Sequence, residues 1–365
     1  MKVAIVCDWL TNVGGAEKVL LEIHRLYPKA PIYTSKYSRR GINWFDDATV
    51  KTGWLQIFPV ALRRFLGPLR QRWFSKLDLS EYDLIISVTG AEAKAVRATK
   101  PGAKHISYCH APTQYYWQLY DTYVKNPGFG ILNPLVRFFF KLLVKPLREK
   151  DYEAAQYVDE FVTISNYTKE LILKYYKREA TVIHPPVEIK DFAHKNEEIG
   201  NYYIVTSRQV NWKRLDLAVK ACAKLKRELI VVGEGPEHAR LVKITSNFEF
   251  VKFVPLVGKG ELAKYLGEAK GYLFPSLEPF GIAPVEALAA GTPVIAFGEG
   301  GALDYVIEGK NGILFEKQTV TSLEEAILKF EKMKFDRAEV SKTAREFSVE
   351  RFDREIKEFV HEKTV

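Results

Sequence analysis

Two glutamates, Glu278 and Glu286, are separated by seven residues in the segment EPFGIAPVE. Glu278 follows an apolar run typical of a strand, and the next helix is predicted to begin near Pro284, because proline suits the first helical turn. Gly291 is predicted to end that helix. The start of a helix presents free backbone N–H groups and a positive dipole end, so it attracts phosphate. Two carboxylates beside such an anion site can bind hydroxyl groups on either side of a diphosphate.

Two cations, Arg208 and Lys213, follow another strand-like run, NYYIVTSR, and precede a helical pattern. That position is the carboxyl end of a parallel strand, where ligands bind in doubly wound folds. Cations there can neutralise the charge that develops on a diphosphate leaving group. A solvated basic turn is the structural alternative, as a solvated surface carboxylate is for either glutamate alone.

Three residues of the first half extend the candidate site. Gly14 and Gly15 follow the first strand-like run, and His110 ends the run KHISYCHA. Glycines between a strand and a helix let the backbone approach a phosphate, although glycine is also the default residue of a tight turn. A buried structural histidine is the alternative for His110.

Strand-like runs alternate with helical patterns along the whole chain, which is typical of parallel sheets with crossover helices. The predicted strands are KVAIVCDWL, APIYTS, DLIISVTG, KHISYCHA, EFVTISN and ATVIHPPV, then NYYIVTSR, ELIVVGEG, FEFVKFVP, GYLFPS, TPVIAFG and GILF. Two prolines and a charged stretch interrupt the pattern at 186–199, which indicates a linker. We therefore expect an α/β protein with two Rossmann-like doubly wound parallel-sheet domains, at 1–186 and 187–347.

The final segment, at about 348–363, is predicted to be a helix with Phe352, Ile356 and Phe359 on one stripe. It packs either on the C-terminal domain or back on the N-terminal domain.

The net charge of +9 at pH 7 lies in the first half, since residues 1–185 hold 27 Lys and Arg against 17 Asp and Glu. A basic half suggests an anionic partner, such as nucleic acid, acidic phospholipid or a pyrophosphate. Within it, residues 59–76 and 133–150 interleave cations with bulky apolar side chains. Helices of this kind can lie on an anionic membrane. The alternative is a pair of ordinary helices whose apolar sides face the core.

The three cysteines, Cys7, Cys109 and Cys222, lack metal-ligand spacing, and each lies in an apolar context. Cys109 and His110 point to opposite faces of a strand, so a buried thiol is expected rather than a nucleophile. The start MKVAIVCDWL does not resemble a signal peptide, and no apolar run is long enough to span a bilayer. We expect a mature protein that starts at Met1, in the cytoplasm or peripheral to the inner face of the plasma membrane.

With these motifs, nearly the whole chain resembles glycosyltransferase family 4, retaining enzymes of the GT-B fold. The spacing of Glu278 and Glu286 is its most specific feature, and NVGGAEKVL, YCHAP, VTSRQVNWKRLDLAVKA and VVGEGPEHARL match further family segments. The GT-B fold implies two domains that face a cleft, the N-terminal one binding the acceptor and the C-terminal one a nucleotide sugar. The implied catalytic residues are His110, Arg208, Lys213 and Glu278. The implied donor-binding residues are Gly14, Gly15, Arg208, Lys213, Gly233, Glu234, Glu278, Phe280, Gly281, Ile282 and Glu286.

The resemblance implies that the leaving phosphate oxygen takes the acceptor's proton and that Glu278 orients the sugar. The chain contains no Asp-x-Asp triple. We therefore expect no metal and no other cofactor, because Arg208, Lys213 and the helix start would supply the positive charge.

The segments YCHAPTQYYWQLY and GGALDYVIEGKNGILF are most similar to the O-antigen mannosyltransferase branch of the family. The predicted donor is therefore GDP-mannose, with a UDP-sugar as the alternative. The predicted acceptor is a saccharide or a polyprenyl-linked glycan in cell-surface polysaccharide assembly.

Three other classes of protein share some of these features. A nucleotide-sugar epimerase shares the two-domain plan. An NAD-dependent dehydrogenase has only one formal fingerprint match, GKGELA at 258–263, and Pro255 interrupts the strand before it. A nucleic-acid-binding module would use the basic half, but its cations are scattered and form no known nucleic-acid motif.

Overall fold

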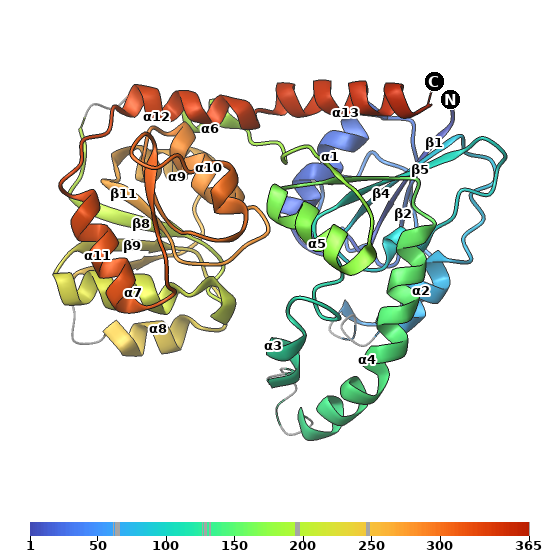
Figure 1. The fold of residues 1–365 in the computed structure, drawn as a ribbon, viewed down its shortest axis with the longest axis horizontal. Coiled ribbons are helices and arrows are strands. Elements are labelled where there is room, and N and C mark those ends of the chain that lie inside the picture. The colour runs from blue at the N-terminus through green and yellow to red at the C-terminus, as the bar shows by residue number, and fades with distance from the viewer. Residues whose placement is uncertain are drawn as a thin grey trace. The chain divides into compact units, whose positions relative to one another are not determined.

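The computed structural model describes every residue except 61, 63–65, 126, 128–129, 131–132, 194–197, 246–248 and 365. The chain divides into two units. The N-terminal unit is Met1–His184 together with Phe352–Val365, and the C-terminal unit is Pro185–Arg351. Within the described residues, the strands of each unit form one wholly parallel sheet, shown in Figure 1.

The sheet of the N-terminal unit has the order β3-β2-β1-β4-β5-β6-β7. In the register, Ile5 of β1 pairs with Ile32 of β2 on one side and with Ile86 of β4 on the other. These strands are runs of Val and Ile because helices cover both faces of a parallel sheet, which leaves neither face to water. The two-residue strand β3 was not predicted. The strands are β1 (Val3–Cys7), β2 (Ile32–Thr34), β3 (Val50–Lys51), β4 (Leu84–Thr89), β5 (Lys104–Cys109), β6 (Glu160–Thr163) and β7 (Thr181–Val182).

The sheet of the C-terminal unit has the order β10-β9-β8-β11-β12-β13. All of its strands were predicted, although Phe248, in the run assigned to β10, lies outside the described residues. The strands are β8 (Tyr202–Thr206), β9 (Glu228–Val232), β10 (Val251–Val254), β11 (Gly271–Phe274), β12 (Val294–Phe297) and β13 (Gly312–Phe315).

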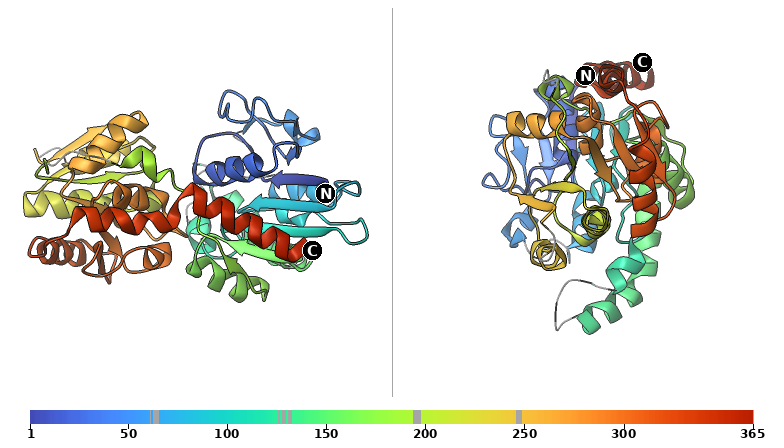
Figure 2. Two further views of the ribbon diagram at one scale, coloured as in Figure 1. Left: turned by 90° about the horizontal axis from the view of Figure 1, so that it is seen from above. Right: turned by 90° about the vertical axis from the view of Figure 1, so that its left-hand side faces the viewer.

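Helices cover both faces of each sheet, as Figures 1 and 2 show. In the N-terminal unit they are α1 (Gly15–Leu26), α2 (Gly67–Phe74), α3 (Tyr120–Lys125), α4 (Asn133–Gln156), α5 (Asn166–Tyr176) and most of α13 (Val349–Thr364). In the C-terminal unit they are α6 (Ile189–Phe192), α7 (Leu215–Leu225), α8 (His238–Thr245), α9 (Lys259–Glu268), α10 (Ile282–Ala289), α11 (Val320–Phe330) and α12 (Arg337–Thr343). None of the helices in the described ranges has the length and apolar character of a bilayer span.

Both sheets are doubly wound, and each reverses its winding at one point. The reversal lies between β1 and β4 in the N-terminal unit and between β8 and β11 in the C-terminal unit. At such a point the loops after two neighbouring strands diverge to opposite faces, which leaves room for a ligand at the carboxyl edge. We call these two places the N-terminal and the C-terminal switch point.

The predicted linker at 186–199 is partly wrong. Val187 and Phe192 are buried, and α6 lies inside the segment. Val187 also forms a β-bridge with Ser348. The first residues of the segment therefore pack into the C-terminal unit, while 194–197 lie outside the described part of the chain.

The final helix has its apolar stripe buried as predicted, with Phe352, Ile356 and Phe359 almost inaccessible to water. The Phe352 ring contacts Tyr108 of β5 edge to face, with ring centroids 5.8 Å apart. This contact favours the second of the two predicted packings, on the N-terminal unit.

The segments 59–76 and 133–150, which were predicted to be basic amphipathic helices, differ from that prediction in the structure. In 59–76, the described α-helix is α2 alone, and Arg70 is buried in it rather than facing water. The rest of that prediction falls partly on residues 61 and 63–65, outside the described residues.

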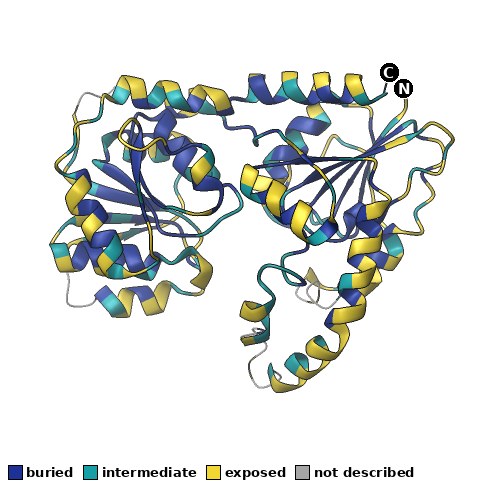
Figure 3. Ribbon diagram, viewed as in Figure 1, coloured by how far each residue is buried: buried dark blue, intermediate teal, exposed yellow. Residues whose placement is uncertain are grey.

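In 133–150, α4 buries Val144 near its middle and Leu147 just beyond it. Its first half instead exposes large apolar side chains, as the exposed colouring of α4 in Figure 3 shows. These are Leu135, Phe138, Phe139, Leu142 and Leu143. The alternative prediction, that the apolar side of this helix faces the core, is therefore wrong for the first half of α4.

The cysteines agree with the prediction of buried thiols. All three are free and buried. Burial raises the pKa of the Cys109 thiol to about 12, so the group is protonated at neutral pH and is not a nucleophile.

Candidate functional site

The C-terminal switch point brings together Lys213 and Glu278, which are 65 positions apart in the chain. Lys213 ends the short turn Asn211–Lys213 after β8, and Glu278 lies in the loop after β11. The Lys213 Nζ is 2.5 Å from the Glu278 Oε1, and each side chain is 18% exposed. The Ser276 hydroxyl also donates to Glu278 Oε1, at 2.8 Å. A cation and a carboxylate are thus held in contact, but water reaches both.

Arg208 lies two residues past the end of β8 and is exposed. Its guanidinium forms no ion pair with any other described residue, whereas its backbone carbonyl accepts from Val210 N–H at 2.9 Å. The backbone of this loop is therefore fixed while the charge at its tip stays open to a ligand.

Gln209, which the sequence analysis missed, connects this loop to the turn after β9. Its side chain is fully buried. Its Nε2 donates to the Gly233 carbonyl at 2.5 Å, and its backbone N–H donates to the Glu234 carbonyl at 2.8 Å. At Gly233, with φ of +122°, a Cβ would lie 2.3 Å from the Ser207 carbonyl oxygen, so the two loops touch there. Gln209 thus links the backbone beside Arg208 to the predicted residues Gly233 and Glu234.

The amino end of α10 is open for an anion. The helix begins at Ile282, two residues before the predicted start, and Pro284 still lies in its first turn. Gly281 precedes it with φ of +90°, and a Cβ there would lie 2.6 Å from the Phe274 ring. A glycine has no side chain with which to cap the first N–H groups, so Gly281 leaves this end of the helix without a side-chain cap of its own.

Phe280 and Glu286 flank this helix start. The Tyr305 hydroxyl donates to the Phe280 carbonyl at 3.0 Å, and this hydrogen bond holds the loop that precedes α10. Glu286 is buried on α10. The pKa of the Tyr272 phenol is raised, first by its burial and further by the nearby carboxylates of Glu278 and Glu286. Both glutamates therefore lie within electrostatic reach of one buried group.

In the N-terminal unit, Gly14 and Gly15 form the amino end of α1, with Gly14 as the residue before the helix. Asp8, a residue that sequence reasoning also missed, lies one position past β1. Its carboxylate accepts from the Thr89 hydroxyl at 2.9 Å, from Gly90 N–H at 2.9 Å and from Ala93 N–H at 2.8 Å. The carboxyl ends of β1 and β4 are thereby joined at the N-terminal switch point.

His110 ends β5 next to this point. Burial lowers the pKa of its imidazole to about 4, so the ring is neutral at physiological pH. Its Nε2 is buried and has no hydrogen-bond partner among the described residues. A buried polar atom without a partner is unfavourable, and it fits a position where a ligand hydroxyl completes the bond.

Residues 187–347 match the family described as Glycosyl transferases group 1. Over 193 residues the chain is 27% identical to an uncharacterized glycosyltransferase of Methanocaldococcus jannaschii, covering 52% of this chain and 54% of the relative. Over 198 residues it is 27% identical to a GDP-mannose-dependent alpha-(1-6)-phosphatidylinositol monomannoside mannosyltransferase of Mycolicibacterium smegmatis, covering 46% of this chain and 52% of the relative. The chain thus spans about half the length of these curated relatives.

Among solved structures, the crystal structure of Anabaena HepE in complex with UDP-glucose has the same fold, with a TM-score of 0.73 and 18% identity. That likeness covers 99% of this chain and 100% of the other. Two parallel-sheet Rossmann-like units therefore make up the whole described chain. The C-terminal switch point lies within residues 187–347, the part of the chain that is similar to the group 1 glycosyl transferases.

Proposed function

We propose that the protein is a retaining hexosyltransferase that moves mannose from GDP-mannose to a saccharide or a lipid-linked glycan. One observation carries the proposal: Lys213, Glu278 and the open amino end of α10 lie at a single switch point of the domain that matches the glycosyl transferase family. A diphosphate with a sugar on one side and a nucleoside on the other fits such an arrangement of charges.

In this proposal the first N–H groups of α10, Arg208 and Lys213 bind the diphosphate. Because Lys213 is paired with Glu278 before the donor arrives, donor binding exchanges one anionic partner of Lys213 for another. Glu278 is then free to accept hydrogen bonds from sugar hydroxyls, and Glu286 from the ribose. Cations that are already in place stabilise the charge that grows on the leaving diphosphate.

Transfer with retention follows from groups on one face of the sugar. The bond between the anomeric carbon and the phosphate oxygen breaks, the acceptor oxygen bonds to that carbon, and the acceptor's proton passes to the departing phosphate oxygen. Glu278 orients the sugar rather than attacking it. The neutral His110 and the Gly14 and Gly15 turn are proposed to join the donor site.

The donor is proposed by similarity, since one relative is GDP-mannose-dependent, whereas the solved structure with the same fold holds UDP-glucose. A thermal-shift panel of GDP-mannose, UDP-glucose and ADP-glucose tests it, because a ligand that binds only the folded state raises the melting temperature. We expect the largest shift with GDP-mannose. A larger shift with UDP-glucose would reassign the donor, and no shift with any of the three would contradict the proposal.

We also propose that the reaction needs no metal, because Arg208, Lys213 and the α10 amino end supply the positive charge. Transfer measured after exhaustive chelation of divalent ions should match that of the untreated protein. Loss of transfer that returns on adding Mg²⁺ or Mn²⁺ would contradict this part.

An epimerase is the alternative within the same class of substrate. It would change the configuration of a free nucleotide sugar without any acceptor. Incubating the protein with GDP-mannose or UDP-glucose alone and analysing the sugar therefore separates the two activities.

The first half of α4 supports a further element of the proposal, contact with an anionic membrane that carries the acceptor. Phe138 and Leu142 are 63% and 62% exposed, and they lie one helical turn apart. Arg137, Lys141 and Lys145 alternate with these side chains, and no carboxylate occurs between Asn133 and Arg148. Exposed apolar side chains with basic neighbours favour insertion at the headgroup level of anionic lipid.

Co-sedimentation with vesicles tests this element. The wild type should bind vesicles that contain phosphatidylglycerol more tightly than pure phosphatidylcholine, and high salt should weaken binding. The double change Phe138→Ser/Leu142→Ser should reduce binding about tenfold or more. Leu173→Ser, at an exposed leucine of α5, is the matched control. Equal binding to both lipids, or an unaffected double variant, would remove the membrane from the proposal.

A further inference from the structure

Two ion pairs of the N-terminal unit are buried and lie outside the predicted site. Glu92 and Lys94 stand two residues apart in the turn after β4. Glu92 pairs with Arg70 of α2, and Lys94 pairs with Asp151 of α4. In each pair both side chains are at most 4% exposed.

We propose that these two pairs position residues 110–119, the post-β5 loop, as the acceptor-binding wall of the N-terminal unit. Glu92 and Asp151 are then positioning residues that act through the loop. The inference rests on the proposed function and adds to it the segment that recognises the acceptor.

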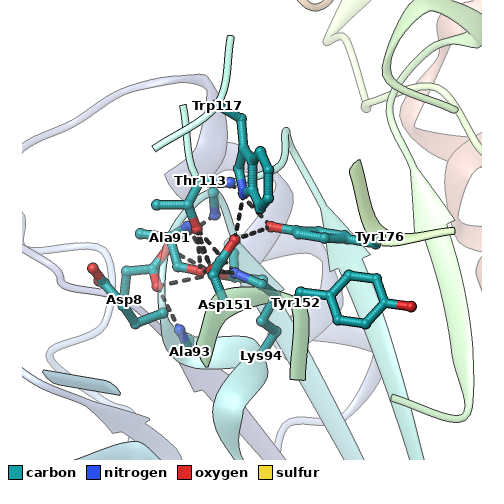
Figure 4. A network of polar contacts seen from close by, with 12 residues as sticks. Asp8, Ala91, Ala93, Lys94, Thr113, Trp117, Asp151, Tyr152 and Tyr176 are labelled. Carbon is teal, nitrogen blue, oxygen red and sulfur yellow. Dashed lines mark hydrogen bonds and ion pairs between the residues drawn. The ribbon is translucent and has the colours of Figure 1, made fainter. Parts of the chain in front are cut away.

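Figure 4 shows how Asp151 holds the loop. Its Oδ1 accepts from Lys94 Nζ at 2.6 Å and from the Thr113 hydroxyl at 2.8 Å. Its Oδ2 accepts from Trp117 Nε1 at 2.7 Å and from the Tyr176 hydroxyl at 2.8 Å. Two of the four donors thus belong to the post-β5 loop.

Lys94 completes the same network. Besides Asp151, its Nζ donates to the Ala91 carbonyl at 2.6 Å and to the Thr113 hydroxyl at 2.9 Å. All three of its protons therefore have acceptors, one of them in the loop. Every charge in this pair is satisfied without water.

The second pair holds the loop two residues away from Thr113. The Arg70 Nε donates to Glu92 Oε2 at 2.8 Å, and the Tyr115 hydroxyl donates to Glu92 Oε1. Burial raises the pKa of the Glu92 carboxyl, and the Arg70 guanidinium opposes that effect. The hydrogen bonds from Arg70 and Tyr115 offset the cost of burying the Glu92 carboxylate.

Stabilisation of the fold is not a sufficient reason for burying these two ion pairs. Taking two charges out of water costs about as much as their attraction returns, and apolar side chains of similar size often serve as well. What apolar side chains cannot do is orient a hydroxyl and an indole N–H. Both carboxylates accept such donors from the post-β5 loop, at Thr113, Tyr115 and Trp117.

The position of the loop indicates the acceptor. It begins at His110, at the carboxyl edge of β5, whereas most predicted donor-binding residues belong to the C-terminal unit. Arg148 of α4 donates to the Tyr116 carbonyl at 2.5 Å and lies over the rings of Trp117 and Tyr120. Tyr175 also stacks on the Trp117 ring, with centroids 5.0 Å apart. The half-exposed ring edges and the Arg148 guanidinium are therefore the groups that this edge offers to a saccharide.

The first test changes the loop by one group. Thr113→Val removes the hydroxyl and keeps the shape, whereas Thr113→Ser keeps the hydroxyl. With GDP-mannose as donor and a polyprenyl-diphosphate-linked saccharide as acceptor, Thr113→Val should raise the acceptor KM about tenfold and leave the donor KM within about twofold. Thr113→Ser should restore both values.

The second test replaces a whole pair. Lys94→Met/Asp151→Leu exchanges it for apolar side chains, so the protein should fold while the loop loses its anchor. We expect faster hydrogen exchange in residues 110–119 and the same rise in acceptor KM. Lys224→Met/Glu324→Leu, at a partly exposed lysine–glutamate pair of the C-terminal unit, is the control for the loss of an ion pair far from the loop.

The outcomes distinguish a failure of the proposed function from a failure of the inference about the post-β5 loop. If the wild type transfers no sugar to this acceptor, the proposed function fails and this inference fails with it. If the wild type transfers sugar but both variants keep its acceptor KM, this inference alone is overturned. A rise in donor KM as large as that in acceptor KM would also overturn it, because the loop would then serve the donor.

Discussion

The charged side chains beside β4 in the N-terminal unit and those beside β8 and β11 in the C-terminal unit differ in their access to water. Arg70, Glu92, Lys94 and Asp151 are enclosed, and each is paired inside the unit. Arg208 is exposed, and Lys213 and Glu278 are partly exposed. Both groups flank the switch point of a doubly wound sheet.

This difference separates charges that hold the chain from charges that can hold a ligand. A buried pair cannot exchange its partner without opening the structure, since the partner and the neighbouring hydrogen-bonding groups replace the lost hydration. A pair that water reaches can exchange one partner for a diphosphate at small cost. The comparison therefore predicts that changes in the N-terminal group affect stability most and changes in the C-terminal group affect turnover most.

Removing one partner of a buried pair should have the largest effect on stability. Glu92→Gln removes the negative charge that compensates the buried Arg70 guanidinium, and we expect the free energy of unfolding to fall by about 3–5 kcal/mol. Lys213→Gln should lower it by only about 1 kcal/mol, because water reaches that pair. Urea denaturation of both variants measures the contrast. Equal losses would contradict the distinction between the two regions.

Glu278 should have the largest effect on turnover. Glu278→Gln keeps the size but loses the negative charge that orients the sugar, and kcat should fall about 10²–10³-fold with little change in melting temperature. Steady-state kinetics with GDP-mannose measures this. Glu308→Gln, at an exposed ion pair of the same unit, is the control. A variant with kcat within twofold of the wild type would remove Glu278 from the catalytic residues.

Arg208 should show a moderate effect on turnover and almost none on stability. Arg208→Gln removes an exposed cation, so we expect kcat/KM for the donor to fall about 10–10²-fold because diphosphate charge is less well neutralised. Arg208→Lys should recover part of the loss. If Arg208→Gln lowered the melting temperature by as much as Glu92→Gln does, Arg208 would belong with the enclosed group.

The smallest expected effect is a dependence of stability on pH that arises in the N-terminal unit. Burial lowers the pKa of His105 to about 4, from about 6.5 when unfolded. Between these values the unfolded state binds more protons, so stability is complete above about pH 6.5 and falls as the pH drops towards 4.

For His105 alone this loss is about 2 kcal/mol by pH 5. His105→Gln should make the melting temperature less sensitive to pH between 7 and 5, whereas His361→Gln, on the exposed end of α13, should not. An unchanged pH profile in His105→Gln would show that the buried imidazole is not the cause.

Sequence reasoning predicted the residues of the C-terminal switch point for a physical reason. Strand periodicity placed the ends of β8 and β11, and Arg208, Lys213 and Glu278 lie in the loops that follow those ends. Gly281 and Pro284 indicated the start of a helix between strands. These signals are local, so they can be read from the sequence without knowing which elements are neighbours in the fold.

The same reasoning missed residues whose role depends on distant partners. Nothing in the sequence distinguishes Gln209 from other polar residues, because its role comes from its hydrogen bond to Gly233 in the turn after β9. Lysines are mostly exposed in proteins, yet Lys94 is buried and donates to Asp151, 57 positions away in the chain. Conversely, Phe138 and Leu142 were compatible with the core and proved to be exposed.

The sequence by itself determined the alternation of strands and helices, the two parallel sheets and the residues at the ends of β8 and β11, because these follow from periodicity and from glycine and proline. Only the tertiary structure decided that β8 adjoins β11, which brings Lys213 to Glu278, and that Glu92 and Asp151 lie beneath the post-β5 loop. Strand order and burial depend on which surfaces exclude water together, and that is a property of the packed chain rather than of any one segment.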